Sequence, residues 1–472
     1  MKNLTLANIA LSCGGHYHGP EDKKSFTVTD ITTDSRKVTP GCLFVAIKGA
    51  RVDAHDFIPQ VIAAGAEAVL SERDLGTVDF PYIQVESSQI AVKGIAEFYL
   101  KQLNIPVVGI VGSVGKTSTK EMVFSVLRQK YNVLKTEGNF NNELGVPLTV
   151  FRLRDEHRIA VLEMGISDFG EMSRLARITR PDTCIMTNIG DCHLENLHDR
   201  EGVYKAKSEV FDFMRQEGHV ILNGNDALLS AVKEVNGRET IHFGIAGKDS
   251  EDLTVFADQV SPMGIKGIRA MFHTPAGNFQ AMVPSPGEHS LMNALAATAA
   301  GLVYGLTTEE IQAGIASYQA ISGRFHVIET ENYTIIDDCY NANPVSMKAS
   351  LSVLAYASGR SVAVLGDMGE LGEHEMALHA EVGRFAAENG IDAIYCAGAR
   401  MKHLADAARV EGEHIPLSGG KRPEICHFED KAALLEALPD LLKKGDTILV
   451  KASHFMGFEE IVKTLENGCS KS

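Results

Sequence analysis

The chain has 472 residues, which is too long for a single hydrophobic core and predicts about three domains. Lys and Arg number 45 and Asp and Glu number 61, so the formal net charge is −16, which excludes a general nucleic-acid binder because neutralising phosphates requires a basic face. The most apolar stretch, 291–306, contains Asn293 and is too short to cross a membrane, and the eight cysteines show no CxxC spacing. We therefore expect a cytoplasmic protein with reduced thiols, no membrane insertion and no nucleic-acid partner.

The first 104 residues are predicted to form a small α/β domain. Residues 4–11 are mostly apolar and end before two glycines, which favours a short amphipathic helix over a weak signal peptide. Short β-like runs then alternate with helical patterns such as 61–66. The β-like runs are 42–47, 68–70 and 82–85.

The region 105–320 is predicted to be a second, central domain. It opens with a buried strand at 105–111, and the pattern of apolar strand, glycine turn and amphipathic helix then repeats, which is typical of a mostly parallel, doubly wound sheet. Further strands are predicted at 159–162, 183–187 and 220–222. We expect a hairpin insertion at 251–285 and an Ala-rich helix at 290–304.

The region 321–472 is predicted to be a third, Rossmann-like α/β domain. Its glycines do not form GxGxxG, so no dinucleotide is indicated. Strands are expected at 334–336, 361–365, 393–396 and 447–450, with helices at 344–357 and 376–389. The predicted fold class is therefore α/β with three domains, the central one of the phosphate-loop type.

A glycine-rich turn follows the strand at 105–111 and indicates a nucleotide site. Backbone N–H groups of such a turn can hold a phosphate chain, Lys116 can reach the β- and γ-phosphates, and the Thr117 hydroxyl can ligate Mg²⁺. The first glycine of the strict motif is replaced by Ile110, so the loop is a shortened GxxGKT. The candidate residues are Gly112, Ser113, Val114, Gly115, Lys116, Thr117 and Ser118.

Two polar side chains near strand ends are candidate ligands for a divalent cation. Glu163 closes one predicted strand, and His193 follows another. Ligands of open α/β sheets bind at the carboxyl ends of the strands, so both side chains are expected near the phosphate loop. Either residue alone would more often be structural.

Several separated motifs resemble those of the Mur ligases, and the resemblance runs from end to end. The first domain has TDSR at 33–36 and DAHDF at 53–57, and the central domain has GNFNNELGVP at 138–147, YKAKSE at 204–209 and GEHSLMN at 287–293. The third domain has GR at 323–324, DDCYNANP at 337–344, GDMGELG at 366–372 and VKASH at 450–454.

The resemblance implies an ATP-dependent amide ligase that adds D-Ala-D-Ala to a UDP-MurNAc-tripeptide, because DDCYNANP and GDMGELG are similar to the motifs of that member. It implies ATP and Mg²⁺ as cofactors and catalytic roles for Lys116, Lys207 and His193. We also expect a monomer. Lys207 would be carbamylated and would hold metal together with Thr117, Glu163 and His193. The remaining implied contacts are Asn142, Asn293, Arg324 and Asp338 for ATP, and Ser35 and Arg36 for the UDP substrate.

Some positions differ from the family pattern, and other functions stay open. Ala54, Ser290, Cys339, Ala452 and His454 replace residues that are typical of the family. One alternative is a sibling ligase that adds a free amino acid, although that sibling carries DYAHTP where this chain has DDCYNANP. A phosphate-loop kinase or GTPase and a non-enzymatic ATP-binding scaffold are the alternatives from other classes.

Overall fold

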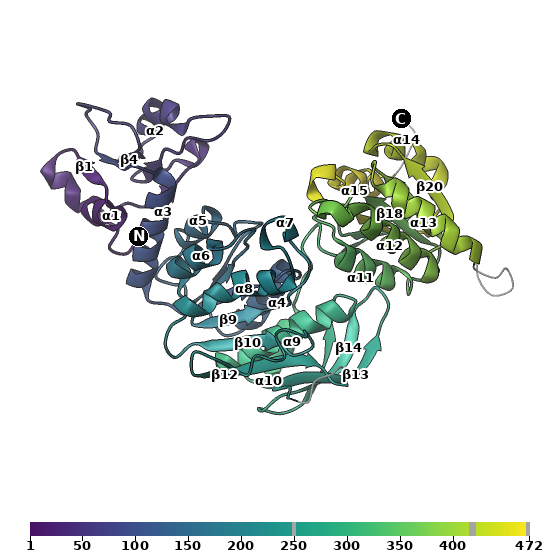
Figure 1. Cartoon of the computed structure of the whole chain (residues 1–472). Coiled ribbons are helices and arrows are strands. Elements are labelled where there is room, and N and C mark those ends of the chain that lie inside the picture. The colour runs from purple at the N-terminus through teal and green to yellow at the C-terminus, as the bar shows by residue number, and fades with distance from the viewer. Residues whose placement is uncertain (248–251, 415–421, 469–472) are drawn as a thin grey trace.

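Three β-sheets follow one another along the chain, each with helices packed on it (Figure 1). The structure is a computed structural model that describes residues 1–247, 252–414 and 422–468. The central unit lies between the other two, as the purple, teal and green-to-yellow ribbons show. This arrangement confirms the predicted α/β class with three sheet-containing units.

The first unit is a five-stranded sheet in the order β1-β5-β4-β3-β2, in which only the β1–β5 pair is antiparallel. The strands are β1 (His16–His18), β2 (Ile31–Thr32), β3 (Leu43–Val45), β4 (Ala68–Ser71) and β5 (Tyr82–Gln84). The helices are α1 (Leu6–Cys13), α2 (Ile58–Ala63) and α3 (Ser88–Leu103), and short 3₁₀ turns cover Glu21–Ser25, Ser35–Lys37 and Ala54–Phe57. As expected, α1 ends at a glycine, Gly14, which adopts a left-handed conformation.

The central unit contains a ten-stranded sheet whose main path is β15-β14-β13-β12-β10-β9-β6-β8-β7. The strands are β6 (Val107–Val111), β7 (Val133–Lys135), β8 (Ile159–Glu163), β9 (Thr183–Met186), β10 (His219–Asn223), β11 (Glu234–Val235), β12 (Arg238–Ile245), β13 (Val255–Pro262), β14 (Ile268–His273) and β15 (Phe279–Val283). The helices are α4 (Lys116–Leu127), α5 (Gly145–Val150), α6 (Glu171–Thr179), α7 (Leu194–Leu197), α8 (Arg200–Ser208), α9 (Glu288–Val303) and α10 (Thr308–Ala316), with a 3₁₀ turn at Glu209–Phe213.

The expected insertion at 251–285 is part of the central sheet. β13 pairs in parallel with β12, and β14 and β15 then add antiparallel strands at that edge. The inward-facing residues of these strands join the core beneath α9, so the segment cannot be a separate hairpin. Residue 251 lies outside the described residues.

The third unit is a six-stranded sheet in the order β16-β17-β21-β18-β19-β20, parallel except for the β16–β17 pair. The strands are β16 (His326–Glu329), β17 (Thr334–Asp337), β18 (Ser361–Gly366), β19 (Ala393–Ala397), β20 (Glu424–Phe428) and β21 (Thr447–Lys451). The helices are α11 (Pro344–Leu354), α12 (Glu375–Glu388), α13 (Met401–His414), α14 (Lys431–Leu441) and α15 (Glu459–Glu466), with 3₁₀ turns at Gly372–His374 and His454–Met456.

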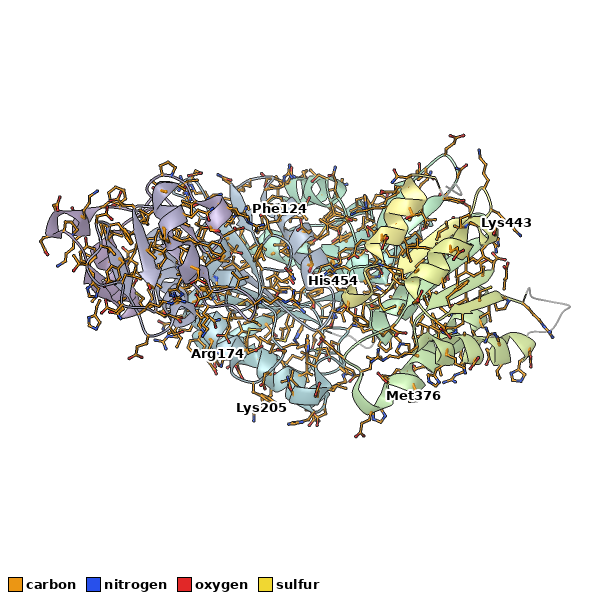
Figure 2. The ribbon with its side chains drawn as sticks, turned by 90° about the horizontal axis from the view of Figure 1, so that it is seen from above. Phe124, Arg174, Lys205, Met376, Lys443 and His454 are labelled. Atoms are coloured by element: carbon orange, nitrogen blue, oxygen red, sulfur yellow. The ribbon has the colours of Figure 1, made fainter. Side chains whose placement is uncertain are left out.

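The first unit shares a hydrophobic core with the central unit. That core combines buried side chains of α3, such as Ile95 and Tyr99, with Val107 and Leu162 of the central sheet. By contrast, the buried side chains of the two core clusters of the third unit all come from residues 325–465. Viewed from above, His454 lies on the side of the third unit that faces the central unit (Figure 2).

Two further expectations concern the membrane and the cysteines. Over the described ranges, every helix is too short or too polar to cross a membrane. Seven cysteines are free thiols, in agreement with the expectation of reduced cysteines, and Cys469 lies outside the described residues.

Candidate active site

The loop between β6 and α4 is held in place by the segment that follows β9. The backbone N–H of Ser113 donates to the Asn188 carbonyl at 3.0 Å, and that of Val114 donates to Asn188 Oδ1 at 2.9 Å. Gly112 has a φ of +150°, and a Cβ there would lie 2.0 Å from Thr187 Oγ1. Glycine is therefore required where the loop approaches the neighbouring strand end.

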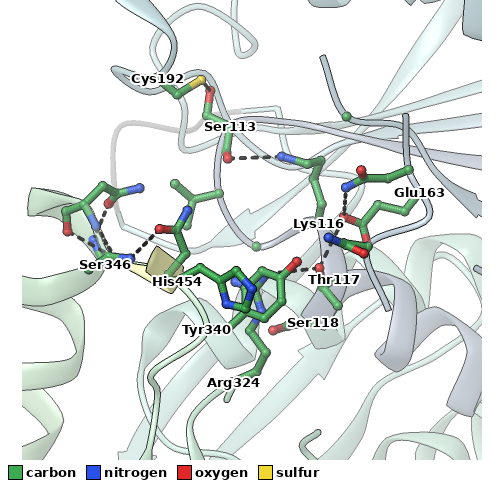
Figure 3. A pocket seen from close by; sticks show the side chains of 18 of the residues that line it. Ser113, Lys116, Thr117, Ser118, Glu163, Cys192, Arg324, Tyr340, Ser346 and His454 are labelled. Atoms are coloured by element: carbon green, nitrogen blue, oxygen red, sulfur yellow. Dashed lines mark hydrogen bonds between the residues drawn. The ribbon is translucent and has the colours of Figure 1, made fainter. Parts of the chain in front are cut away.

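Lys116 is the first residue of α4 and folds back over the loop (Figure 3). Its Nζ donates to the carbonyl oxygens of Gly112 and Ser113 at 2.8 and 3.2 Å. Burial lowers the pKa of Lys116, while the negative charge of Glu163 opposes that shift. The α4 N-terminus also presents backbone N–H groups that lack partners within the helix, so the loop suits a phosphate chain.

Glu163, at the end of β8, lies directly beside Thr117. Its Oε1 accepts from Thr117 Oγ1 at 3.2 Å and from Asn141 Nδ2 at 2.9 Å, whereas its Oε2 is buried without a hydrogen bond. Oε1, which lies beside the Thr117 hydroxyl, therefore fits one side of a Mg²⁺ site. The described residues contain no cluster of three or more His, Cys, Asp or Glu that could hold a metal, so a cation here would need ligands from phosphates.

His193 and Lys207 both lie near the phosphate loop, but only His193 has a charged partner among the described residues. His193 has a φ of +52°, and its Nδ1 lies 3.5 Å from Glu370 Oε2 of the third unit. Lys207 is buried in α8, and burial followed by the charge of Lys116 lowers its pKa to about 8. Within the described part of the chain, Lys207 has no hydrogen bond or ion pair. An ammonium cannot ligate a cation, so the unmodified Lys207 does not fit a metal site.

Arg324 of the third unit reaches the phosphate loop. Its Nη2 lies 3.4 Å from Thr117 Oγ1, and its Nε is buried without a partner. The neighbouring Asp338 also lines the cavity, but its carboxylate is already bound by protein groups. Asp338 Oδ2 accepts from Lys451 Nζ and from Ser350 Oγ, both at 2.6 Å. Asp338 therefore connects β21 and α11 on the side of the cavity formed by the third unit.

The two asparagines expected at the nucleotide both have their side-chain oxygens bonded within the protein. Asn293 Oδ1 accepts from Thr119 Oγ1 at 2.8 Å, which places Asn293 beside α4. Asn142 lines the cavity, but its Oδ1 accepts from the N–H groups of Leu144 and Gly145 at the start of α5.

Ser35 and Arg36 are not brought to the phosphate loop. They lie in the first unit, and Arg36 is exposed, with its Nε and Nη2 donating to Asp34 at 2.9 Å. The cavity around the loop has a volume of about 1100 Å³ and is lined by all three units, including Lys93 of α3. Any substrate that touches both Arg36 and Lys116 must therefore extend from the first unit into this cavity.

Three family models match the chain almost from end to end. "Mur ligase family, catalytic domain" matches residues 27–112, "Mur ligase middle domain" matches 110–301, and "Mur ligase, glutamate ligase domain" matches 323–454. The UDP-N-acetylmuramoyl-tripeptide–D-alanyl-D-alanine ligase of Escherichia coli is 38% identical over 99% of this chain and 100% of its own length. The chain belongs to the Mur ligase family.

Further relatives of this Mur ligase agree in sequence and in fold. The Bacillus subtilis protein of the same name is 35% identical over 98% of this chain and 99% of its own length. The crystal structure of MurF from Acinetobacter baumannii has a TM-score of 0.86 and 32% identity, with 98% of each chain covered. MurF from Thermotoga maritima, solved in complex with ADP, has a TM-score of 0.80 and 29% identity over 93% of this chain and 97% of that one.

Three departures from the Mur ligase pattern are buried, and two of them, Cys339 and Ser290, make hydrogen bonds within the protein. Cys339 donates its Sγ–H to Asp337 Oδ1 at 2.9 Å, as a serine hydroxyl would, and burial raises the pKa of its thiol. The hydroxyl of Ser290 donates to the Pro286 carbonyl and contacts Ser285 Oγ, both at 2.9 Å, and is thereby used inside the protein. Ala452 is fully buried in the core of the third unit.

Three residues of this Mur ligase site were not predicted from the sequence. Asn141 lies in the loop 138–147 that resembles a family motif, but its hydrogen bond to Glu163 is visible only in the structure. Tyr340 lies under the Arg324 guanidinium, and Lys120 lies buried behind Glu163. The spacing of Lys120, four residues after Lys116, places both on one side of α4 and was the available signal.

Proposed function

We propose that the chain joins D-Ala-D-Ala to UDP-MurNAc-tripeptide in an ATP-dependent amide ligation that releases ADP and phosphate during peptidoglycan precursor synthesis. The observation that carries the proposal is the contact of Arg324 in the third unit with Thr117 in the phosphate loop of the central unit. The phosphate loop and Arg324 therefore line the same cavity. End-to-end relatives that bear the name of this ligase supply the identity of the substrates.

The reaction needs activation of a carboxylate. A carboxylate is a poor electrophile because attack by an amine would have to expel oxide. Transfer of the γ-phosphoryl group of ATP to the C-terminal carboxylate of the tripeptide gives an acyl phosphate, whose leaving group is phosphate. The amine of D-Ala-D-Ala then attacks the acyl carbon, and the tetrahedral intermediate collapses with loss of phosphate and a proton.

The residues of the cavity have positioning and electrostatic roles in this scheme. Lys116 stabilises negative charge on the transferred phosphoryl group, together with the backbone N–H groups at the start of α4. Arg324 adds positive charge from the third unit, so the complete set of charges exists only while the two units are in contact. Asn293, which lies beside Gly115 and Thr119 at the start of α4, contacts the nucleotide, and Asn142 shapes the adjoining loop. Ser35 and Arg36 hold the UDP part of the substrate on the first unit.

The proposed Mg²⁺ is held by Thr117 and Glu163, whose oxygens fit such a cation. When bound, Mg²⁺ neutralises charge on the phosphate oxygens. A second cation beside His193 requires carbamylation of Lys207, which would convert the buried ammonium into an oxygen ligand. Exposure to carbon-13 bicarbonate should give a carbamate signal in the NMR spectrum, and the signal should be absent in Lys207→Arg.

The domain boundaries, the localisation and the oligomeric state complete the proposal. We propose a UDP-substrate domain at 1–104, an ATP-binding domain at 105–320 and a ligase domain at 321–472, which act in a cytoplasmic monomer. All three proposed domains line one cavity within a single chain. Sedimentation at micromolar concentration should give the mass of one chain, and a stable dimer would contradict the monomer.

Phosphate release tests the proposed function. We expect release from ATP and Mg²⁺ to require both UDP-MurNAc-tripeptide and D-Ala-D-Ala, with the pentapeptide nucleotide as the product. Consumption of a free amino acid on a shorter precursor would instead identify a sibling ligase. Release without any peptide substrate would indicate a kinase or NTPase, and nucleotide binding without turnover would indicate a scaffold.

A further inference from the structure

Lys120 is a buried lysine on α4, one turn after Lys116, and the proposed mechanism does not use it. Its side chain is fully buried, and its Nζ makes no hydrogen bond. Removing an ammonium from water in this way is costly unless opposite charges compensate. Two carboxylates do so, because Nζ lies 3.4 Å from Glu121 Oε1 and 3.6 Å from Glu163 Oε2.

The contact with Glu163 joins two polar atoms that both lack hydrogen bonds. Glu163 Oε2 is buried without a hydrogen bond and lies 3.6 Å from the ammonium of Lys120, whereas Oε1 accepts from Thr117 and Asn141. The carboxylate therefore has one oxygen beside the phosphate loop and the other beside a buried cation. A divalent cation that approached Oε2 would meet the positive charge of Lys120.

Several positive charges surround Glu163 at the phosphate loop. Arg324 reaches Thr117, and Lys116 is close enough for Glu163 to influence its pKa. Together with Lys120, these cations outnumber the negative charge of Glu163, because the second carboxylate beside Lys120, that of Glu121, also pairs with Lys135. A free dication is consequently disfavoured, whereas the polyphosphate of a nucleotide would reverse the balance and supply further oxygen ligands.

We propose that Lys120 is a positioning residue that restricts Glu163 to one-oxygen ligation and keeps the nucleotide-free site weak for divalent cations. The metal then enters and leaves together with the nucleotide. The role given to the nucleotide rests on the proposed function, whereas the effect of Lys120 on the affinity for divalent cations does not. Glu121 compensates the other side of Lys120, and its own Oε2 pairs with Lys135.

Mn²⁺ binding to the nucleotide-free protein, followed by electron paramagnetic resonance, tests the proposal. Lys120→Met keeps most of the side-chain volume and removes the charge, so it should bind Mn²⁺ roughly tenfold more tightly than the wild type, or more. Lys135→Met removes a lysine from the same charge cluster at a position that pairs with Glu121, and it should change the affinity much less. Adding Glu163→Gln to Lys120→Met should abolish the gain, because the proposed ligand is lost.

Two further variants separate metal affinity from stability. Lys120→Met combined with Glu121→Gln removes one charge of each sign, so it should fold even if the single variant does not, and it should still bind Mn²⁺ more tightly. Lys120→Arg retains the charge and should keep the weak binding of the wild type. If both variants that carry Met at position 120 bind Mn²⁺ no more tightly than the wild type, Lys120 only fills the core and the proposal is wrong.

The experiment is independent of the ligase reaction. None of its arms uses UDP-MurNAc-tripeptide or D-Ala-D-Ala, so failure of the proposed function would leave the metal-binding result unchanged. Conversely, an active ligase whose Lys120→Met variant shows unchanged Mn²⁺ affinity would overturn only the role of Lys120.

Discussion

The guanidinium of Arg324 lies over the ring of Tyr340, with its central carbon 3.9 Å from the ring centroid. The same guanidinium extends to Thr117 Oγ1 at 3.4 Å (Figure 3). The ring of His454 also packs against Tyr340, with the two ring centroids 5.5 Å apart. The aromatic ring therefore limits the directions in which Arg324 can point while it reaches the phosphate loop.

Replacing Tyr340 with Leu should weaken the contribution of Arg324 to turnover. A cation–π contact contributes about 0.5–2 kcal/mol, so we expect kcat/KM for ATP to fall roughly 2- to 30-fold. Tyr340→Phe keeps the ring and should stay close to the wild type. Steady-state phosphate release measures both variants, and an equal loss in Phe and Leu would show that the hydroxyl, and not the ring, is required.

Lys116→Ala should remove phosphate release without unfolding the protein. The Nζ of Lys116 binds only carbonyl oxygens of its own loop among the described residues, so its loss leaves the core intact. We expect a decrease in kcat of at least about 100-fold. Lys130→Ala, past the other end of α4, is the matched control and should retain activity. Near-normal phosphate release by Lys116→Ala would contradict the role of this lysine.

Ser290→Ala should lower stability and leave nucleotide affinity unchanged. The Ser290 hydroxyl is bonded inside the protein to Pro286 and Ser285, so its removal should cost about 1 kcal/mol in the free energy of unfolding. Urea denaturation measures this loss, and titration with ADP should give an affinity within about twofold of the wild type. A large loss of ADP affinity would instead place the hydroxyl at the nucleotide.

The third unit should become less stable in mild acid, because unfolding allows the buried His379 to bind a proton. Burial lowers the pKa of His379 from its ordinary value of 6.5, and its Nε2 accepts from the Met368 N–H at 3.0 Å. Because the folded pKa lies below the unfolded one, the stabilisation is fully present above pH 6.5 and is lost as the pH falls below that value.

The variant His379→Gln isolates this contribution. Tm of the wild type should fall between about pH 7 and pH 5, and Tm of His379→Gln should fall less over the same range. Differential scanning calorimetry in buffers of constant ionic strength makes the comparison. Parallel curves for the two proteins would mean that the pKa of His379 is the same in the folded and unfolded states, which would contradict the prediction.

Much of the fold could be predicted because its parallel strands are continuous apolar runs. Val107–Val111 and Ile159–Glu163 are buried along their full length, so each was recognisable without knowledge of its neighbours. β13 has exposed and buried residues in irregular order, with a register shift between Asp258 and Ser261. Its place in the central sheet depends on pairing with β12 and could not be inferred locally.

The candidate site could be predicted only where its residues follow one another in the chain. The loop Gly112–Ser118 is such a segment, and its shape follows from β6, its glycines and α4. The contacts of Lys120 with Glu163 and of Tyr340 with Arg324 bring different elements together. A lysine within a helical pattern is normally expected in solvent, so the burial of Lys120 became visible only in the folded chain.

The transfer of oxygen from substrate to phosphate tests the central claim most directly. The tripeptide carboxylate that becomes the new amide would be labelled with oxygen-18, and the released phosphate would be analysed by mass spectrometry after reaction with ATP and D-Ala-D-Ala. Activation through an acyl phosphate predicts one labelled oxygen in each phosphate released. Unlabelled phosphate would mean that ATP is hydrolysed without phosphorylating the carboxylate, and would contradict the proposed ligase.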